Sequence, residues 1–289
     1  MSWTLSAFTD EAGPSAQDQI DAALRAGLKF VDIRSIEGHN VTALPVPLAK
    51  EIKSRLDDAG LKVQMFGSPI GKIDIVEDMR VDLQKLRHLA ELAPVLGCNA
   101  VRLFSYYNNE NKPKHLWQAE SLSRLLLLRG EAEELGLVLY HENERHIFGD
   151  LAADVKEIAQ LRNAHLKLIF DFDNYNQSGE DVWENWVLLR DVTDSIHLKD
   201  SAKTEAGYQH TVVGEGGGQV KTIVADAVAR GWSGPAAVEP HLSHSGAVAA
   251  TGPGGIANAS FASMPTAESF HVAVVAAQEL LKAAGARVE

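Results

Sequence analysis

The stretch Val138-Leu139-Tyr140-His141-Glu142 is a short apolar run that ends abruptly in an acidic residue. Three later stretches repeat this pattern, namely Leu168-Ile169-Phe170-Asp171, Ser195-Ile196-His197-Leu198 and Ala236-Ala237-Val238-Glu239. Short apolar runs are typical of parallel strands that are buried on both faces. The carboxyl ends of such strands meet at one edge of the sheet, where α/β proteins carry their active sites. The sequence therefore predicts that Glu142, Asp171, His197 and Glu239 gather at one edge of a parallel sheet.

The rest of the chain alternates predicted strands and helices. Apolar segments over 5–9, 30–34, 62–66 and 100–105 predict further strands, and helices are expected over about 14–26, 47–59, 77–96, 115–135, 150–162, 180–191, 219–230 and 266–284. Several helices end in Ala-Gly or Leu-Gly, as at Gly97 and Gly136, where glycine takes the left-handed conformation that ends a helix. Eight strand–helix units predict an α/β fold, a single (β/α)8 TIM barrel spanning residues 1–289 as one domain.

Residues 243–263 stand out because they are rich in Gly, Ala and Ser. They lie between the last predicted strand and the last predicted helix, on the same edge as the four polar residues. Two interpretations are open: a mobile lid over the site, and an insertion without function.

The composition narrows the class of protein. The chain has 289 residues, a net charge of −12 and one cysteine, Cys98. The acidic balance argues against binding of nucleic acid or of an anionic membrane, since both need clustered cations. A lone cysteine cannot form a disulfide within the chain, which fits a reducing cytoplasm. The first residues, Met1 to Leu5, lack the features of a signal peptide, so we expect a cytoplasmic protein.

Three carboxylates and one imidazole form a ligand set for a hard or borderline divalent cation. We expect one divalent metal, Mn²⁺ first, with Mg²⁺, Co²⁺, Fe²⁺ or Zn²⁺ as alternatives. A metal that chelates a carbonyl and its neighbouring hydroxyl acidifies the C–H bond between them and stabilises an enediolate. Glu142 and Glu239 come from opposite sides of the barrel, so they can remove and deliver protons on opposite faces of a substrate. This predicts an isomerase or epimerase of a sugar or polyol.

Six further polar residues fall at or just after predicted strand ends and are candidates for substrate binding: Arg34, Lys72, His141, Asn174, Lys199 and His210. Cations at this edge can bind substrate oxygens, but each is also able to pair with a neighbouring acid. Two glycine-containing stretches leave similar alternatives. Residues 67–72 are either a turn or a substrate contact, and residues 214–218 are either a plain turn or an anion site at a helix N-terminus.

Taken in order, these motifs resemble the xylose isomerase-like TIM barrels, a superfamily of sugar isomerases and epimerases, inosose dehydratases and the endonuclease IV group. The resemblance covers nearly the whole chain. It is strongest at His197-Leu198-Lys199-Asp200-Ser201, followed by Val213-Gly214-Glu215-Gly216. The resemblance implies a metal on Glu142, Asp171, His197 and Glu239, two catalytic glutamates and a small-molecule carbohydrate substrate. A homo-oligomer is plausible by the same analogy.

The chain departs from two branches of this superfamily. Ketose 3-epimerases place Glu, His and Arg where this chain has Phe148, Asn174 and Lys203. Endonuclease IV resemblance implies three zincs and an Asp-x-His pair, where this chain reads Tyr208-Gln209-His210. These differences argue against a free ketohexose and against DNA as substrates.

Two alternatives to an isomerase or epimerase stay open. The first is a lyase or dehydratase that acts on a keto-sugar, keto-glycoside or inosose by the same enolisation. The second is a non-catalytic sugar-binding barrel or an accessory subunit of a complex.

Overall fold

A ring of parallel strands forms the centre of the structure, a computed structural model that describes residues 2–243, 245–250 and 255–289. The strands are β1 (Thr4–Ala7), β2 (Phe30–Ile33), β5 (Lys62–Phe66), β6 (Ala100–Leu103), β7 (Val138–Glu142), β8 (Leu166–Asp171), β9 (Ser195–Leu198) and β12 (Pro235–Val238). Their hydrogen-bonded order is β1-β12-β9-β8-β7-β6-β5-β2. A parallel bridge between Phe8 and Asp32 then brings β1 beside β2. The prediction of a (β/α)8 TIM barrel is confirmed.

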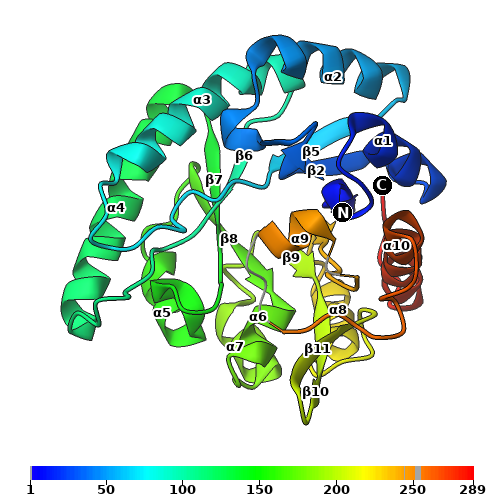
Figure 1. Ribbon diagram of the computed structural model, residues 1–289. Helices are drawn as coiled ribbons and strands as arrows, with labels where there is room; N and C mark the ends of the chain where they lie inside the picture. The colour runs from blue at the N-terminus through cyan, green and yellow to red at the C-terminus, as the bar shows by residue number, and fades with distance from the viewer. Residues whose placement is uncertain (1, 244, 251–254) are drawn as a thin grey trace.

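Helices surround the strands on the outside (Figure 1). They are α1 (Ala16–Arg25), α2 (Val46–Asp58), α3 (Arg80–Leu96), α4 (Lys114–Leu135), α5 (Ala152–Ala159), α7 (Val182–Leu189), α8 (Val220–Ala229) and α10 (Thr266–Ala283). Their apolar stripes pack on the strands; Leu86, Leu89 and Leu96 of α3, for example, are all buried. The last helix closes against the first, and the Trp3 N–H donates to the Arg287 carbonyl at 2.7 Å. Among the described residues, no helix is both long and apolar enough to cross a membrane.

The predicted ends of the long helices α3 and α4 agree with the structure. The predicted end of the first strand does not, and this difference matters for the site. Gly97 and Gly136 end α3 and α4 with φ values of 69° and 71°, so the predicted left-handed caps are confirmed. The strand predicted over 5–9 ends at Ala7 instead. Residues Thr9–Glu11 form a 3-10 turn, η1, which brings two further carboxylates to the mouth of the barrel.

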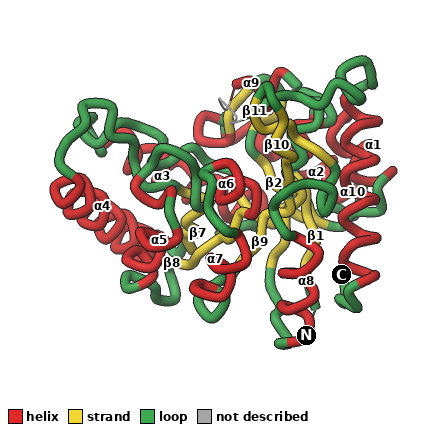
Figure 2. Tube along the Cα trace, turned by 90° about the horizontal axis from the view of Figure 1, so that it is seen from below, coloured by secondary structure: helices red, strands yellow, loops and turns green. Residues whose placement is uncertain are grey.

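Several short elements were not predicted, because they are too short or too polar to give a periodic pattern. They are the hairpin β3 (Ser35–Ile36) and β4 (His39–Asn40), the hairpin β10 (Asp200–Thr204) and β11 (Gly207–Thr211), the helices α6 (Phe172–Gln177) and α9 (Gly246–Ala250), and the 3-10 turns η2 (Val41–Ala43) and η3 (Phe148–Asp150). Figure 2 shows β10, β11 and α9 at the end of the barrel opposite to the chain termini.

The segment predicted as a lid, residues 243–263, is described in part. Residues 244 and 251–254 lie outside the described residues. Of the remainder, α9 contacts η1, and the His210 N–H donates to the Ile256 carbonyl at 3.0 Å. These contacts place the segment on the face that carries the strand ends, and its role as a lid stays a prediction.

Candidate metal centre

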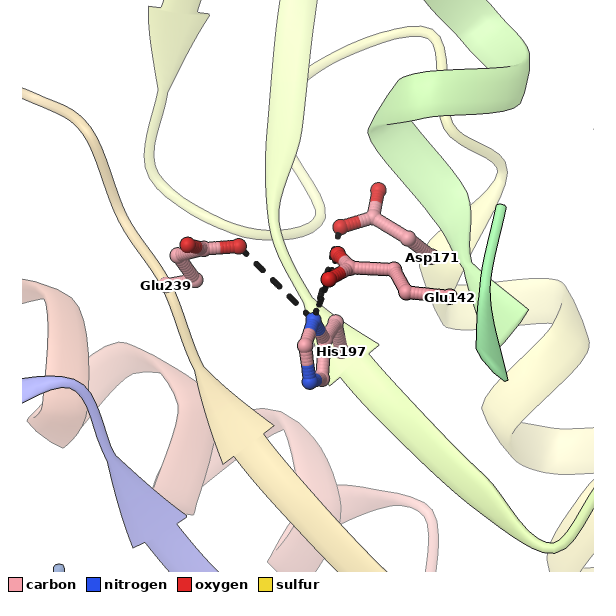
Figure 3. Close-up of side chains that lie close together, drawn as sticks. All are labelled: Glu142, Asp171, His197 and Glu239. Carbon is pink, nitrogen blue, oxygen red and sulfur yellow. Dashed lines mark hydrogen bonds and ion pairs between the residues drawn. The ribbon is translucent and has the colours of Figure 1, made fainter. Parts of the chain in front are cut away.

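Four side chains from neighbouring strands meet at the carboxyl end of the barrel: Glu142, Asp171, His197 and Glu239 (Figure 3). One ligand atom of each lies within 4.8 Å of those of the others, and all four residues are buried. His197 Nδ1 is 2.8 Å from Glu142 Oε1, 3.8 Å from Asp171 Oδ2 and 3.7 Å from Glu239 Oε2. The structure thus brings together the residues that the sequence singled out as metal ligands. We call them the ligand cluster.

Local hydrogen bonds fix the orientation of Asp171. Its Oδ1 accepts the N–H of Asn174 at 2.8 Å and so caps the N-terminus of α6. The side chain of Asn143 accepts the Asp171 N–H at 2.8 Å and donates to the Asp171 carbonyl at 3.0 Å. Asp171 Oδ2 is therefore left for the ligand cluster, and it has no hydrogen-bond partner among the described residues.

Buried cations pair with the carboxylates of the ligand cluster. Arg102 Nη1 lies 3.1 Å from Glu142 Oε2 and 3.4 Å from Glu239 Oε1. Lys199 Nζ lies 3.2 Å from Asp171 Oδ2 and 3.6 Å from Glu239 Oε2. Removing one partner of a buried ion pair leaves an uncompensated charge, so these cations are strongly tied to the carboxylates.

Arg34, at the end of β2, was a candidate for substrate binding. In the structure it binds carboxylates of the chain itself. Its Nε and Nη2 donate to the two carboxylate oxygens of Asp10 at 2.9 Å each. Its Nη1 donates to Glu239 Oε1 at 2.8 Å, and Nη2 lies 3.6 Å from Glu11 Oε1. Arg34 therefore links η1 to the ligand cluster and holds Glu239 in place.

The charges around the ligand cluster shift the pKa of its carboxylates in opposite directions. Burial alone would raise the pKa of Glu142, but His197 and Arg102 outweigh burial and lower it to about 2. Burial likewise opposes ionisation of Glu239, and Lys199, Arg102 and Arg34 hold its pKa well below the usual range. Burial raises the pKa of Asp171 well above its ordinary value, although Lys199 opposes this.

The donor set fits a divalent cation. Three buried carboxylates and one imidazole nitrogen converge, and Asp171 Oδ2 has no hydrogen-bond partner among the described residues. Lys199 Nζ, 3.2 Å from this oxygen, only partly offsets the burial that raises the pKa of Asp171. Oxygen and imidazole ligands of this kind suit Mn²⁺, Mg²⁺, Co²⁺, Fe²⁺ or Zn²⁺.

Two of the other predicted substrate residues lie around the ligand cluster with partners of their own. Lys72 Nζ is 2.7 Å from Glu144 Oε2 and 4.4 Å from the centroid of the Phe104 ring. His210 Nδ1 is 3.4 Å from Asp173 Oδ2, and its ring packs edge-on against that of His241, with centroids 5.3 Å apart. Residues 67–72 thus form a turn that carries Lys72 to the rim of the site.

The last two predicted substrate residues, Asn174 and His141, have contacts that support the fold. Asn174 Nδ2 donates to the Asn143 carbonyl at 2.8 Å, so its side chain ties α6 to the end of β7. His141 precedes Glu142 and, because side chains alternate along a strand, it points to the opposite face of β7. There it is fully buried beneath η3, where a Cβ on Gly149 would lie 2.5 Å from His141 Cε1. The structure does not bring His141 to the ligand cluster.

The glycine stretch 214–218 surrounds a carboxylate of the chain itself. The N–H groups of Gly214, Gly216 and Gly218 donate to the Asp200 carboxylate at 2.9, 2.9 and 2.8 Å. A Cβ at Gly216 would lie 2.3 Å from Asp200 Oδ1, so only glycine allows this close approach. The loop is therefore a turn built around an internal anion, which anchors the start of the β10–β11 hairpin.

Sequence reasoning missed Asp10, Glu11 and Arg102, which surround the ligand cluster from the other side of the barrel. Asp10 and Glu11 directly follow the first strand, and this position was a usable signal. Arg102 lies within the buried strand Ala100-Val101-Arg102-Leu103, where an arginine among apolar residues indicates a buried charge with partners.

Comparison with known proteins agrees with the barrel fold. The sequence model of the family described as xylose isomerase-like TIM barrel matches residues 20–261. The chain belongs to this family. No curated protein matches the chain. The predicted resemblance to xylose isomerase-like TIM barrels is thus confirmed.

Solved structures share this xylose isomerase-like fold at low sequence identity. An IolI protein with a bound zinc atom has a TM-score of 0.73 and 13% identity, over 98% of this chain and 99% of that one. A D-psicose 3-epimerase in the presence of D-fructose has a TM-score of 0.71 and 14% identity, over 96% and 99%. The probable 3-DHS dehydratase AsbF of Bacillus anthracis has a TM-score of 0.65 and 17% identity, over 83% and 92%.

Proposed function

We propose that this chain is a divalent-metal-dependent isomerase or epimerase of a sugar or polyol that removes a proton next to a carbonyl. The observation that carries this proposal is the ligand cluster, in which four buried ligand atoms lie within 4.8 Å of one another. Membership of the xylose isomerase-like family supports an enzyme in general. The similar structures include a protein named as an epimerase and another named as a probable dehydratase.

Glu142, Asp171, His197 and Glu239 would hold the metal, for which we propose Mn²⁺ first. A bound divalent cation supplies Lewis acidity, which polarises a substrate carbonyl and acidifies the neighbouring C–H bond. Mg²⁺, Co²⁺, Fe²⁺ and Zn²⁺ also bind carboxylate oxygens or imidazole and are the alternatives.

The protein residues around this centre supply proton transfer and charge stabilisation. Glu142 and Glu239 approach from β7 and β12, so one takes a proton from the substrate and the other returns one from a different side. Arg102 and Lys199 lie beside these carboxylates and stabilise the negative charge that develops as the proton leaves. At the rim, Lys72 over the Phe104 ring is a candidate contact for substrate oxygens.

The second candidate function is elimination by a lyase or dehydratase, which starts with the same proton removal. Arg102 and Lys199 would stabilise the anion in either reaction. The similar structure of AsbF is named as a probable dehydratase. Product analysis separates the two reactions, because elimination releases water or an alcohol whereas isomerisation conserves the composition of the substrate.

Metal content is the first test of the proposal. The purified protein, Glu142→Ala, His197→Ala and, as a control, Lys203→Ala would be reconstituted with Mn²⁺, desalted and assayed by mass spectrometry. Lys203 is an exposed residue of β10. We expect about one metal per chain in the parent and in Lys203→Ala, and loss of metal in the other two variants. A parent that binds no metal even after reconstitution overturns the proposal and favours the non-catalytic sugar-binding barrel or accessory subunit.

Proton exchange then tests the reaction. The Mn²⁺-loaded parent would be incubated with keto-sugars, keto-glycosides and inososes in heavy water, and the products analysed by NMR and mass spectrometry. Deuterium next to the carbonyl without loss of water indicates isomerisation or epimerisation. Loss of water or an alcohol indicates elimination, and binding without exchange for every ligand found indicates a sugar-binding protein.

A further inference from the structure

Seven buried polar atoms on the barrel strands have no hydrogen-bond partner within the described part of the chain. Three belong to His141 and Asp171, and the other four are Ser6 Oγ, Asp32 Oδ1, Arg102 Nε and His197 Nε2. The residues belong to β1, β2, β6 and β9, and none is more than 5% exposed. Buried polar atoms in proteins almost always have a partner, so a group of four orphans requires a physical explanation.

Strand register and electrostatics place these residues together. Ser6 pairs with Ala237, and Ala237 pairs with His197, so Ser6 and His197 lie on one register line across β1, β12 and β9. Asp32 lies on β2, next to β1 where the barrel closes. Burial raises the pKa of Asp32 to about 7, and the charges of His197 and Arg102 oppose this rise. We call Ser6, Asp32, Arg102 and His197 the barrel-floor group; its Ser6 and His197 share a register line with Asp171 of the ligand cluster.

The ring of His197 connects the barrel-floor group to the ligand cluster. Its Nδ1 faces Glu142, Asp171 and Glu239, and its Nε2 points away from them (Figure 3). A histidine that binds a metal through Nδ1 uses the lone pair of that atom, so its proton must sit on Nε2. A buried N–H without an acceptor costs about 1–3 kcal/mol. Metal-binding histidines therefore donate this second N–H to a carboxylate, a carbonyl or a water.

We propose that Asp32 is a positioning residue for His197, and that it acts through a water molecule bound in the barrel floor. A bound water accepts two hydrogen bonds and donates two. His197 Nε2–H and Arg102 Nε–H are the donors to it, and Asp32 Oδ1 and Ser6 Oγ are the acceptors. These two donors and two acceptors match the hydrogen-bonding capacity of one water. The hydrogen bonds that run from Asp32 through the water hold the proton of His197 on Nε2. They keep Nδ1 free of a proton and turned towards the metal.

This inference rests on the metal site of the proposed function and adds the residue that orients one of its ligands. Four variants test it: Asp32→Asn, which keeps the volume and one acceptor oxygen; Asp32→Ala; Ser6→Ala; and Ser195→Ala as a matched control. Ser195 is also a buried hydroxyl on β9, but it donates to the Pro235 carbonyl at 3.0 Å and is outside the barrel-floor group. Folding of each variant is checked by circular dichroism and thermal unfolding.

The first readout is the dissociation constant for Zn²⁺, a diamagnetic probe, measured by competition with a chelator. Groups that hydrogen-bond a metal ligand without binding the metal themselves typically contribute about 10–100-fold to metal affinity. We therefore expect a loss of Zn²⁺ affinity of that size in Asp32→Ala. Asp32→Asn and Ser6→Ala should lose less, and Ser195→Ala should match the parent. The second readout is the long-range ¹H–¹⁵N spectrum of the histidine rings. In the Zn²⁺-loaded protein, where the metal on Nδ1 leaves the proton on Nε2, that proton should exchange with solvent faster in the Asp32 variants than in the parent.

Folded Asp32 variants that bind Zn²⁺ as tightly as the parent would overturn the inference. So would a lower melting temperature with unchanged affinity, because a purely structural role gives that result. If neither Asp32 variant folds, Ser6→Ala decides by itself, and unchanged Zn²⁺ affinity together with unchanged exchange of the His197 Nε2 proton would overturn the inference. A parent that binds no metal overturns both this inference and the proposed function, whereas unaffected Asp32 variants in a metal-binding parent overturn only this one.

Discussion

The two sides of the barrel mouth contribute different groups to the site. On one side, β7, β8, β9 and β12 supply the ligand cluster, and each ligand lies at or near the end of its strand. On the other side, η1, β2 and β6 supply Asp10, Arg34 and Arg102, which bind one another or the carboxylates across the barrel. We call these the ligand side and the support side. The ligand side carries the proposed chemistry, and the support side fixes its geometry and charge, so substitutions on the two sides should have different effects.

Substitution on the ligand side should give the largest effect. We expect Glu142→Gln and Glu239→Gln each to lower kcat by about 10²–10⁴-fold, because general acid–base catalysis typically contributes that much and an amide cannot take up the proton. Turnover of the substrate found by proton exchange, with metal content measured in parallel, checks this. Glu205→Gln in the exposed β10–β11 turn is the control. Full turnover in both glutamine variants would contradict the two-glutamate mechanism.

Substitution on the support side should mainly lower the free energy of unfolding. Arg34→Met leaves the buried carboxylates of Asp10 and Glu239 without their main partner. Breaking a buried ion pair in this way costs about 3–5 kcal/mol in the free energy of unfolding. Urea unfolding of the metal-free protein in a chelator measures it, with Arg34→Lys expected to lose less. A loss below about 1 kcal/mol, the range of exposed ion pairs, would show that Arg34 does not hold the support side together.

The difference between the two sides also explains what the sequence could predict. The ligand cluster could be predicted because each of its residues follows or ends a short apolar run, and a parallel barrel brings all strand ends together. The support side gives no such signal. Asp10 reaches the site because the chain turns into η1 after Ala7, and a helical turn of three residues has no periodic pattern. Arg102 is placed by burial within β6, and its partners lie 40 and 137 residues away in the sequence.

Position at a strand end does not by itself make a residue part of the site. His141 is adjacent to Glu142 in sequence, but the alternation of the strand turns it to the other face. The run of glycines after Val213 looked like a possible anion site, and it binds the Asp200 carboxylate of the same chain. The alternation of side chains along a strand is a local rule that already separates His141 from Glu142. The pairing of Asp200 with the glycine loop is a tertiary contact, which the local pattern of a single sequence does not encode.

Metal binding should stabilise the parent more than any ligand-side variant. A ligand that binds only the folded state at 100 times its dissociation constant raises the free energy of unfolding by about 2.7 kcal/mol. We expect a rise of that size when Mn²⁺ is added to the parent, and none for His197→Ala. Arg34→Lys keeps the ligand cluster and should still be stabilised by Mn²⁺. Thermal unfolding with Mn²⁺ and with a chelator measures this, and equal shifts in the parent and His197→Ala would place the metal elsewhere.

The smallest expected effect is a pH dependence that comes from Glu11 on the support side. Burial raises the pKa of Glu11 from 4.5 to about 7, although Arg34 opposes the shift. Between these two values the folded protein binds more protons than the unfolded chain, so the free energy of unfolding falls as the pH rises through this window. Glu11→Gln cannot ionise, and the melting temperature of its metal-free form should therefore fall less than that of the parent between pH 5 and pH 8.

Asp32→Asn should change the profile in the same direction, because burial raises the pKa of Asp32 to about 7 as well. Profiles that superimpose for the parent and both variants would mean that the acids of the support side and the barrel floor stay ionised throughout this range.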